Sequence, residues 1–144
     1  MKRFAVAVIA VMLSAAMAFG AVQDFGKFTV DVAAGWTATQ TGPAVVITKD
    51  DKSASMSITV DSAQGNSAEV LAGAFAESFK GSFGKVGTPA ADADGDYSWD
   101  MENNGVTTNA VLHVEDGDYM LITMTNLEAA ADEISAMLGS IQDK

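Results

Sequence analysis

The chain has 144 residues, of which 19 are acidic and 8 are lysine or arginine, so its formal charge is −11. This length fits one small domain, and a hydrophobic content of 49% argues against a disordered chain. The sequence has no cysteine, which excludes disulfides, thiolate metal sites, a cysteine nucleophile and a lipid-modified N-terminal cysteine. The acidic balance argues against nucleic acid as a partner, because such binding uses lysine and arginine to neutralise phosphates.

The N-terminus has the pattern of a secretory signal peptide. Two basic residues precede a short apolar run and a small-x-small motif. Cleavage after Ala18 fits this motif best and cleavage after Gly20 is the second choice, so we expect a signal peptide over 1–18 and one globular domain over 19–144. An uncleaved anchor is the alternative, but the run is shorter than the roughly 20 residues that span a bilayer. We therefore expect an exported protein, periplasmic or secreted, without a stable membrane span.

Three strands are predicted in the first part of the mature chain. Phe28–Val32 alternates apolar and polar residues, as does a normal half-buried strand. Val45–Ile47 is a short apolar strand that follows a Gly-Pro pair. Residues 56–60 alternate again, with serine and threonine on the polar face. This period of two predicts a sheet with one face in contact with water.

The period changes to that of a helix between Asn66 and Lys80. Bulky apolar residues recur there at i, i+4 and i+8, namely Leu71, Phe75 and Phe79. Asn66 and Glu69 have the spacing of a capping box, which predicts that the helix begins at this point.

Two successive hairpins are predicted between Tyr97 and Thr125. Asn104-Gly105 and Asp116-Gly117 are dipeptides that two-residue type I′ turns prefer, because both central residues need positive φ. The two turns place Trp99 opposite Ala110, and Leu112 opposite Leu121. Both registers put the same set of mostly apolar side chains on one face: Tyr97, Trp99, Met101, Ala110, Leu112, Val114, Tyr119 and Leu121.

An amphipathic helix closes the chain. Thr125 and Glu128 have the spacing of a capping box, and an apolar stripe follows at helical spacing: Leu127, Ala130, Ala131, Ile134, Met137, Leu138 and Ile141. We expect this helix to cover the second side of the hairpins, which becomes apolar toward Val111, Met120, Ile122 and Met124. The predicted fold class is α+β, an antiparallel sheet of about six strands in the order β-β-β-α-β-β-β-α, flanked by two helices.

This order of elements resembles the fold shared by the PsbP-type extrinsic proteins of photosystem II, a nuclear-transport factor that binds the Ran GTPase, and exported DcrB-type domains. The resembling segments are Phe28–Trp36, where such proteins have a strand leading into a Pro-x-Gly-Trp corner, and Gly117–Ile122 before the closing helix. Ala33 stands in place of the proline, and the cysteine of the DcrB-type lipobox is lacking. The resemblance implies a binding or assembly role without catalysis, and it names no site residue.

The acidic segment around residue 94 is the candidate metal site. Asp92, Asp94 and Asp96 occupy the first, third and fifth positions of an EF-hand-type loop, and calcium prefers such oxygen ligands. The sixth position is Tyr97 where glycine is required, and the twelfth is Asn103 where a bidentate glutamate is expected. A solvated acidic loop explains the same residues, so calcium at these three aspartates is the alternative hypothesis.

Few other residues offer chemistry. His113 is the single histidine, and the predicted register places it on one face with Glu115 and Met120, where a carboxylate can influence its protonation. Asp100 and Glu102 share a strand face and are the acid–base candidates for a hydrolase. No G-x-S-x-G, S-x-x-K or H-E-x-x-H motif accompanies them in the sequence.

These patterns give three functional hypotheses in order. The first is a non-catalytic exported binding or assembly module, whose partner is an unknown envelope protein or a small ligand, with no cofactor. The second is a calcium-responsive acidic protein using Asp92, Asp94 and Asp96. The third is a hydrolase without a recognisable motif. The methionines and both tryptophans are interpreted as core residues.

Overall fold

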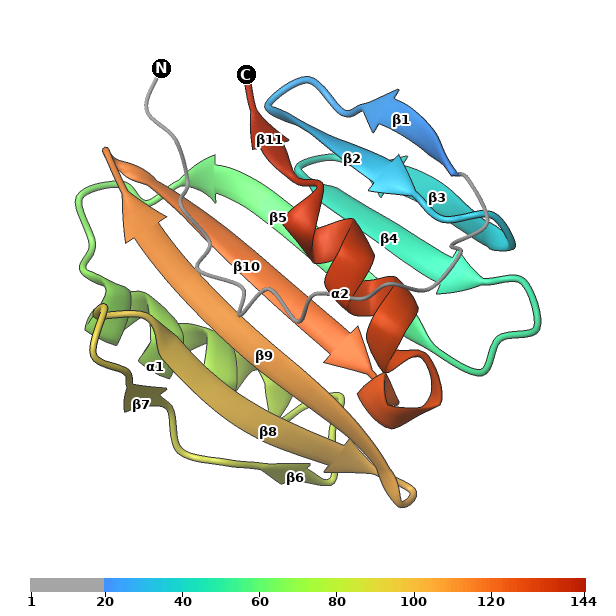
Figure 1. Ribbon diagram of the computed structural model, residues 1–144. Coiled ribbons are helices and arrows are strands. Elements are labelled where there is room, and N and C mark those ends of the chain that lie inside the picture. The colour runs from blue at the N-terminus through green and yellow to red at the C-terminus, as the bar shows by residue number, and fades with distance from the viewer. Residues whose placement is uncertain (1–19) are drawn as a thin grey trace.

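The computed structural model describes residues 20–144 as an α+β fold with two sheets and two α-helices (Figure 1). The expected signal peptide, residues 1–18, lies outside the described residues. A small antiparallel sheet has the order β1 (Ala21–Asp24), β2 (Phe28–Val32) and β11 (Gln142–Asp143). It joins the first strand of the described chain to its last one.

The main sheet has eight strands in the order β3-β4-β5-β10-β9-β8-β6, with β7 also paired to β8. Every pairing in it is antiparallel. The strands are Trp36–Thr41 (β3), Ala44–Lys49 (β4), Ser55–Ser62 (β5), Lys85–Val86 (β6), Ala90–Ala91 (β7), Tyr97–Asn103 (β8), Val106–Glu115 (β9) and Asp118–Thr125 (β10). The central β5–β10 pairing joins the two halves of the chain in one sheet.

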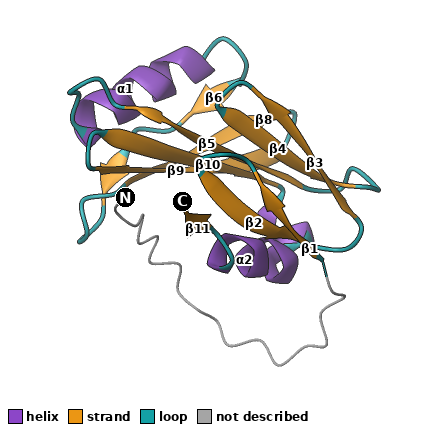
Figure 2. Cartoon of the chain, turned by 90° about the horizontal axis from the view of Figure 1, so that it is seen from above, coloured by secondary structure: helices purple, strands orange, loops and turns teal. Residues whose placement is uncertain are grey.

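The two helices lie on opposite sides of the main sheet (Figure 2). Helix α1 (Ala68–Phe79) packs against β8 and β9, whereas α2 (Ala131–Gly139) packs with the small sheet against β4, β5 and β10. A short 3₁₀ helix, η1 (Leu127–Ala129), connects β10 to α2. Within residues 20–144, helices and the small sheet therefore cover one half of each side of the main sheet and leave the other half uncovered, and the uncovered halves are diagonally opposed.

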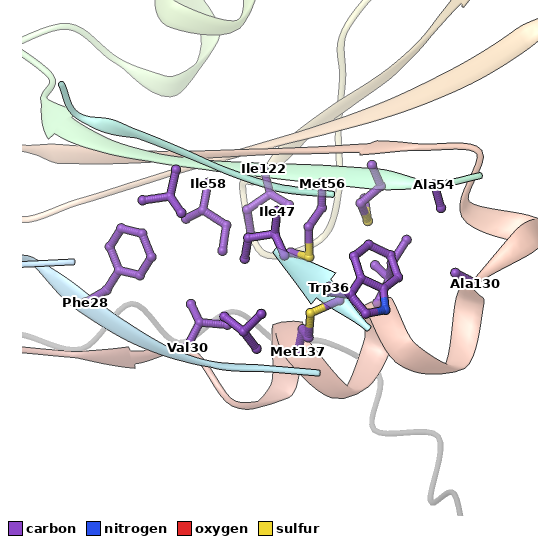
Figure 3. Close-up of a cluster of buried hydrophobic side chains, with 14 of the residues drawn as sticks. Phe28, Val30, Trp36, Ile47, Ala54, Met56, Ile58, Ile122, Ala130 and Met137 are labelled. Carbon is purple, nitrogen blue, oxygen red and sulfur yellow. The ribbon is translucent and has the colours of Figure 1, made fainter. Parts of the chain in front are cut away.

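The α2 side contains the larger core (Figure 3). Side chains from the main sheet, the small sheet and α2 meet there, and Met56, Trp36 and Met137 point into the same space. Ile58 and Ile134 are fully buried at this core. Met120 and Met124 are buried in it as well, so the interpretation of the methionines as core residues is confirmed.

The α1 side contains a smaller core. Ala72 and Ala76 of α1 face Trp99 and Leu112 of the sheet, and larger residues that are only partly buried surround this contact: Leu71, Phe75, Phe79, Phe83, Val86, Tyr97, Val114 and Tyr119. The indole nitrogen of Trp99 is buried and has no hydrogen-bond partner within residues 20–144. The α1-side core is thus the smaller of the two, and it contains one polar atom that is unpaired in the described chain.

The predicted hairpins are confirmed residue by residue. Trp99 pairs with Ala110, and Leu112 pairs with Tyr97 on one side and with Leu121 on the other. Asn104 and Asp116 have φ values of 52° and 53°, as the first positions of type I′ turns require. The eight side chains predicted to share a face all belong to the α1-side core.

Other predictions need correction. The structure contains more strands than the six expected, because a main sheet of eight strands is joined by a small sheet of three. Strand β3 was not predicted, since only Trp36 and Ala38 interrupt its run of polar residues and most of it is exposed. The cap of α1 is Ser67, whose hydroxyl accepts a hydrogen bond from the Val70 amide, and not Asn66.

The closing helix is shorter than its apolar stripe. Asn126 adopts a left-handed conformation with φ of 57°, and its side-chain amide donates to the carbonyl of Ser53 at 2.7 Å. Ala130 is also non-helical, so the predicted first turn is the separate 3₁₀ helix η1. In residues 20–144 no helix has the length and apolar character that crossing a membrane demands.

Candidate functional site

Strands β8 and β9 present a polar surface on the half of the α2 side that no described helix covers. The side chains of two residues that pair across antiparallel strands project to the same side of the sheet. The register of β8 and β9 therefore defines which residues form this surface. We call it the acidic half-face; it consists of Asp96, Ser98, Asp100, Glu102, Thr107, Asn109, His113 and Glu115. Asp100, Glu102 and Glu115 stand on paired strands of the main sheet, which fixes their spacing, and Asp96 immediately precedes β8.

The centre of the acidic half-face is held by contacts between neighbouring strands. The side-chain amide of Asn109 donates to Asp100 Oδ1 at 2.6 Å. Glu102 lies 3.7 Å from the ammonium group of Lys85 on β6, and both side chains are substantially exposed. An exposed ion pair of this kind contributes little to stability.

His113 lies at one end of the acidic half-face between two carboxylates. Its Nδ1 is 2.5 Å from Asp96 Oδ1, and its Nε2 is 3.5 Å from Glu115 Oε2. Burial of the imidazole lowers its pKa, but the hydrogen bond and charge of Asp96, assisted by Glu115, outweigh burial and leave the pKa of His113 above 6.5. The predicted neighbourhood of His113, Glu115 and Met120 is confirmed by the register. The contact between Asp96 and His113 was not predicted, although extending the β8–β9 register by one residue places Asp96 opposite His113.

The predicted metal ligands occupy the loop before β8. Asp92 Oδ1 accepts the backbone amides of Asp94 and Asp96 at 2.8 and 3.0 Å, so this carboxylate shapes the loop. Asp96 is bound to His113, as described above. Within residues 20–144 no group of three or more histidine and acidic side chains is arranged to hold a metal ion. Calcium binding by Asp92, Asp94 and Asp96 stays a prediction.

The hydrolase candidates Asp100 and Glu102 have no histidine close to them in the described chain. His113 is four residues along β9 from Asn109, which pairs with Asp100. A strand rises about 3.3 Å per residue, so His113 lies roughly 13 Å along the strand from the position of Asn109 and Asp100. Asp100 and Glu102 are adjacent on one face, as predicted, but the histidine is too far away to act on the same reacting atoms.

A pocket lies at the other end of the acidic half-face, between the β8–β9 turn and η1. Its volume is about 390 Å³, and its lining residues are Gly105, Thr107, Asn109, Asn126, Leu127 and Glu128. The backbone amide of Asn126 donates to the carbonyl of Thr107 at 2.9 Å, which ties the two walls together. The sequence pattern predicted that Glu128 caps a helix, and it gave no sign that Glu128 lies near β9.

The second open half-face lies on the α1 side and has a different composition. Its outward positions on β3, β4, β5 and β10 are mainly hydroxyl residues, which we call the hydroxyl half-face: Thr37, Thr39, Thr41, Thr48, Ser55, Ser57, Thr59, Thr123 and Thr125. Hydroxyl groups of neighbouring strands hydrogen-bond to one another, as between Ser57 and Thr123. Val46 is the exposed large hydrophobic residue within it, with 42% of its surface accessible.

The Gly-Trp corner has a structural role. Gly35 has φ of +82°, and Trp36 follows it into the α2-side core. The Trp36 indole donates to Glu133 Oε2 of α2, and Glu133 Oε1 lies 2.9 Å from Lys49 Nζ. These two contacts hold the pKa of Glu133 below its usual value, and Glu133 raises the pKa of Lys49. The corner therefore fastens α2 to the edge of the main sheet.

Comparison with known proteins gives a fold and no family assignment. No protein-family model matches the chain, and no curated protein matches its sequence. The solution structure of cyanobacterial PsbP (CyanoP) from Synechocystis sp. PCC 6803 is similar, with a TM-score of 0.60 and 12% identity over 94% of this chain and 99% of that one. A crystal structure from Bacteroides thetaiotaomicron VPI-5482 has a TM-score of 0.49 and 14% identity, over 81% of this chain and 45% of that one. The predicted PsbP-like fold is confirmed, and the likeness to DcrB-type domains is not.

Proposed function

We propose that this protein is a non-catalytic exported module that binds or assembles with a partner in the cell envelope. Export is inferred from the N-terminal sequence pattern, and the binding role is supported by the PsbP-like fold. The observation that carries the proposal is the acidic half-face, where firmly paired strands present carboxylates that the described core does not need for packing.

The partner is expected to present positive charge. The acidic half-face contains four carboxylates, Asp96, Asp100, Glu102 and Glu115, in a chain whose formal charge is −11. These carboxylates outnumber the cationic groups beside them, Lys85 and His113. A surplus of negative charge on one surface steers a positively charged partner toward it and disfavours partners of like charge. Because these groups are partly exposed, salt should weaken the association.

Capture from an envelope fraction tests the proposal with two matched variants. Asp100→Asn/Glu102→Gln removes two negative charges from the acidic half-face, and Thr37→Lys/Thr39→Lys adds two positive charges to the hydroxyl half-face. Both variants change the net charge by the same amount. We expect the first variant to lose a protein that the wild-type protein and the second variant retain. Equal capture by all three, or loss in the second variant alone, would show that the acidic half-face is not the contact surface.

A further inference from the structure

Three side-chain oxygen groups line the pocket beside η1 without a partner in the described chain. The side-chain NH₂ of Asn109 donates to Asp100, and that of Asn126 donates to the carbonyl of Ser53. Within residues 20–144 neither amide oxygen accepts a hydrogen bond, and Glu128 has no ion-pair partner. Each amide therefore commits one of its two N–H donors to the protein, while both carbonyl oxygens and the Glu128 carboxylate stay open to a ligand.

The charge around the pocket has one sign. Glu128 is exposed at its wall, and Asp100 is bonded to the wall residue Asn109. The six lining residues include no lysine, arginine or histidine. An anion would meet carboxylates and find no cationic side chain among these residues, so the electrostatics favour a cation.

The number of carboxylates decides between a metal ion and an organic cation. Calcium takes six to eight oxygen ligands and usually several carboxylates, whereas Glu128 is the one carboxylate that lines the pocket. A protonated primary amine instead offers three N–H donors on one charge. Two amide oxygens and one carboxylate match three donors in number. The hydroxyl of Thr107 adds a group that can also accept.

We propose that this pocket binds a small aliphatic compound with a protonated primary amine. The ammonium group is bound by Glu128 and the amide oxygens of Asn109 and Asn126, while Leu127 contacts the methylene chain. A volume of about 390 Å³ is at the lower end of ligand pockets and suits a short diamine. This pocket adjoins the acidic half-face and shares Thr107 and Asn109 with it. Its ligand is a small molecule, so binding there does not require a macromolecular partner.

Nuclear magnetic resonance titration of the purified protein with 1,4-diaminobutane tests the inference. The side-chain NH₂ signals of Asn109 and Asn126 should shift and saturate. Tetramethylammonium carries the charge without N–H donors, and 1,4-butanediol carries the chain without charge, so neither should produce saturable shifts. Glu128→Gln should weaken the affinity by about tenfold or more because it removes a charge-assisted hydrogen bond. The matched control Glu69→Gln, on the exposed face of α1, should change it by less than about twofold.

Two results would overturn the inference. One is an equal response to tetramethylammonium, which would mean general attraction to an acidic surface. The other is saturable diamine binding that Glu128→Gln leaves unchanged, which would place the amine elsewhere. A protein that binds diamine at this pocket but captures no envelope partner would contradict the proposed function alone.

Discussion

The two open half-faces of the main sheet arise from one architecture but differ in chemistry. Helix α1 covers one half of one side, and α2 with the small sheet covers the diagonal half of the other, so nothing in the described part of the chain covers the remaining half of each side. The acidic half-face carries four carboxylates and the single histidine of the sequence, whereas the hydroxyl half-face carries uncharged serine and threonine. Exposure to solvent is enough to explain why both half-faces carry polar residues. It does not explain why charge is concentrated on one, and this asymmetry supports a binding role for the acidic half-face.

A matched pair of substitutions on β5 gives the largest expected effect. Ile58 is fully buried on the α2 side, while its neighbour Thr59 belongs to the hydroxyl half-face. Ile58→Thr should lower the free energy of unfolding by about 2–4 kcal/mol, because it removes buried methyl groups and introduces a hydroxyl into the core. Thr59→Ile should change it by less than about 0.5 kcal/mol. Urea denaturation measures both, and equal losses would mean that the hydroxyl half-face is covered.

Substitutions of the two tryptophans compare the stability of the two covered halves. Trp36 donates its indole N–H to Glu133, whereas the indole N–H of Trp99 has no partner in the described chain. Trp36→Phe removes a hydrogen bond to a charged group and should cost about 1–2 kcal/mol more than Trp99→Phe. The same denaturation measurement tests this difference. A larger loss in Trp99→Phe would mean that the α1-side core is the more tightly packed one.

The ion pair at His113 gives a pH-dependent effect on the acidic half-face. The raised pKa of His113 means that its contribution to stability is complete below 6.5 and is lost as the pH rises through the folded-state pKa. Asp96→Asn should lower that pKa and reduce the difference in stability between about pH 5.5 and about pH 8. We expect a change below about 1 kcal/mol, because the groups are partly solvated.

Titration of the imidazole signals measures the pKa, and thermal unfolding at the two pH values measures the stability. Asp94→Asn is the control in the same loop, because the hydrogen bonds of that loop use the backbone amide of Asp94 and not its carboxylate. An unchanged histidine pKa in Asp96→Asn, or an equal shift in both variants, would contradict the observed contact.

Calcium should give the smallest effect. Asp92 and Asp96 already bind backbone amides and His113, so their carboxylates would exchange existing contacts for the ion. We expect little change in Tm with calcium. A clear rise that Asp92→Asn abolishes would instead establish the calcium hypothesis, since a ligand that binds the folded state stabilises it.

The parts of the fold that the sequence predicts well are those with redundant local signals. The hairpins of β8, β9 and β10 have two glycine-containing turns and one shared apolar face, and each fixes the same register. Strand β3 has no such redundancy, because it is an edge strand with few apolar residues. The two-residue strands β6, β7 and β11 are too short to show any period.

The candidate sites depend on contacts between distant segments. The pair of Asp96 and His113 follows from the predicted register, so the sequence contains the signal for it. The pocket does not follow, because its shape depends on the left-handed Asn126 and on the carbonyl of Ser53 that binds its side chain. A capping-box pattern at Thr125 pointed to a continuous helix, and tertiary contacts interrupted it.

Carboxyl-group labelling of the protein, alone and with its envelope partner bound, tests the role of the acidic half-face most directly. Mass spectrometry then reports the labelling of each aspartate and glutamate. We predict that labelling of Asp100 and Glu102 falls in the complex, while labelling of Asp61, beside the hydroxyl half-face, stays the same. Protection of Asp61 with full labelling of Asp100 and Glu102 would contradict the account.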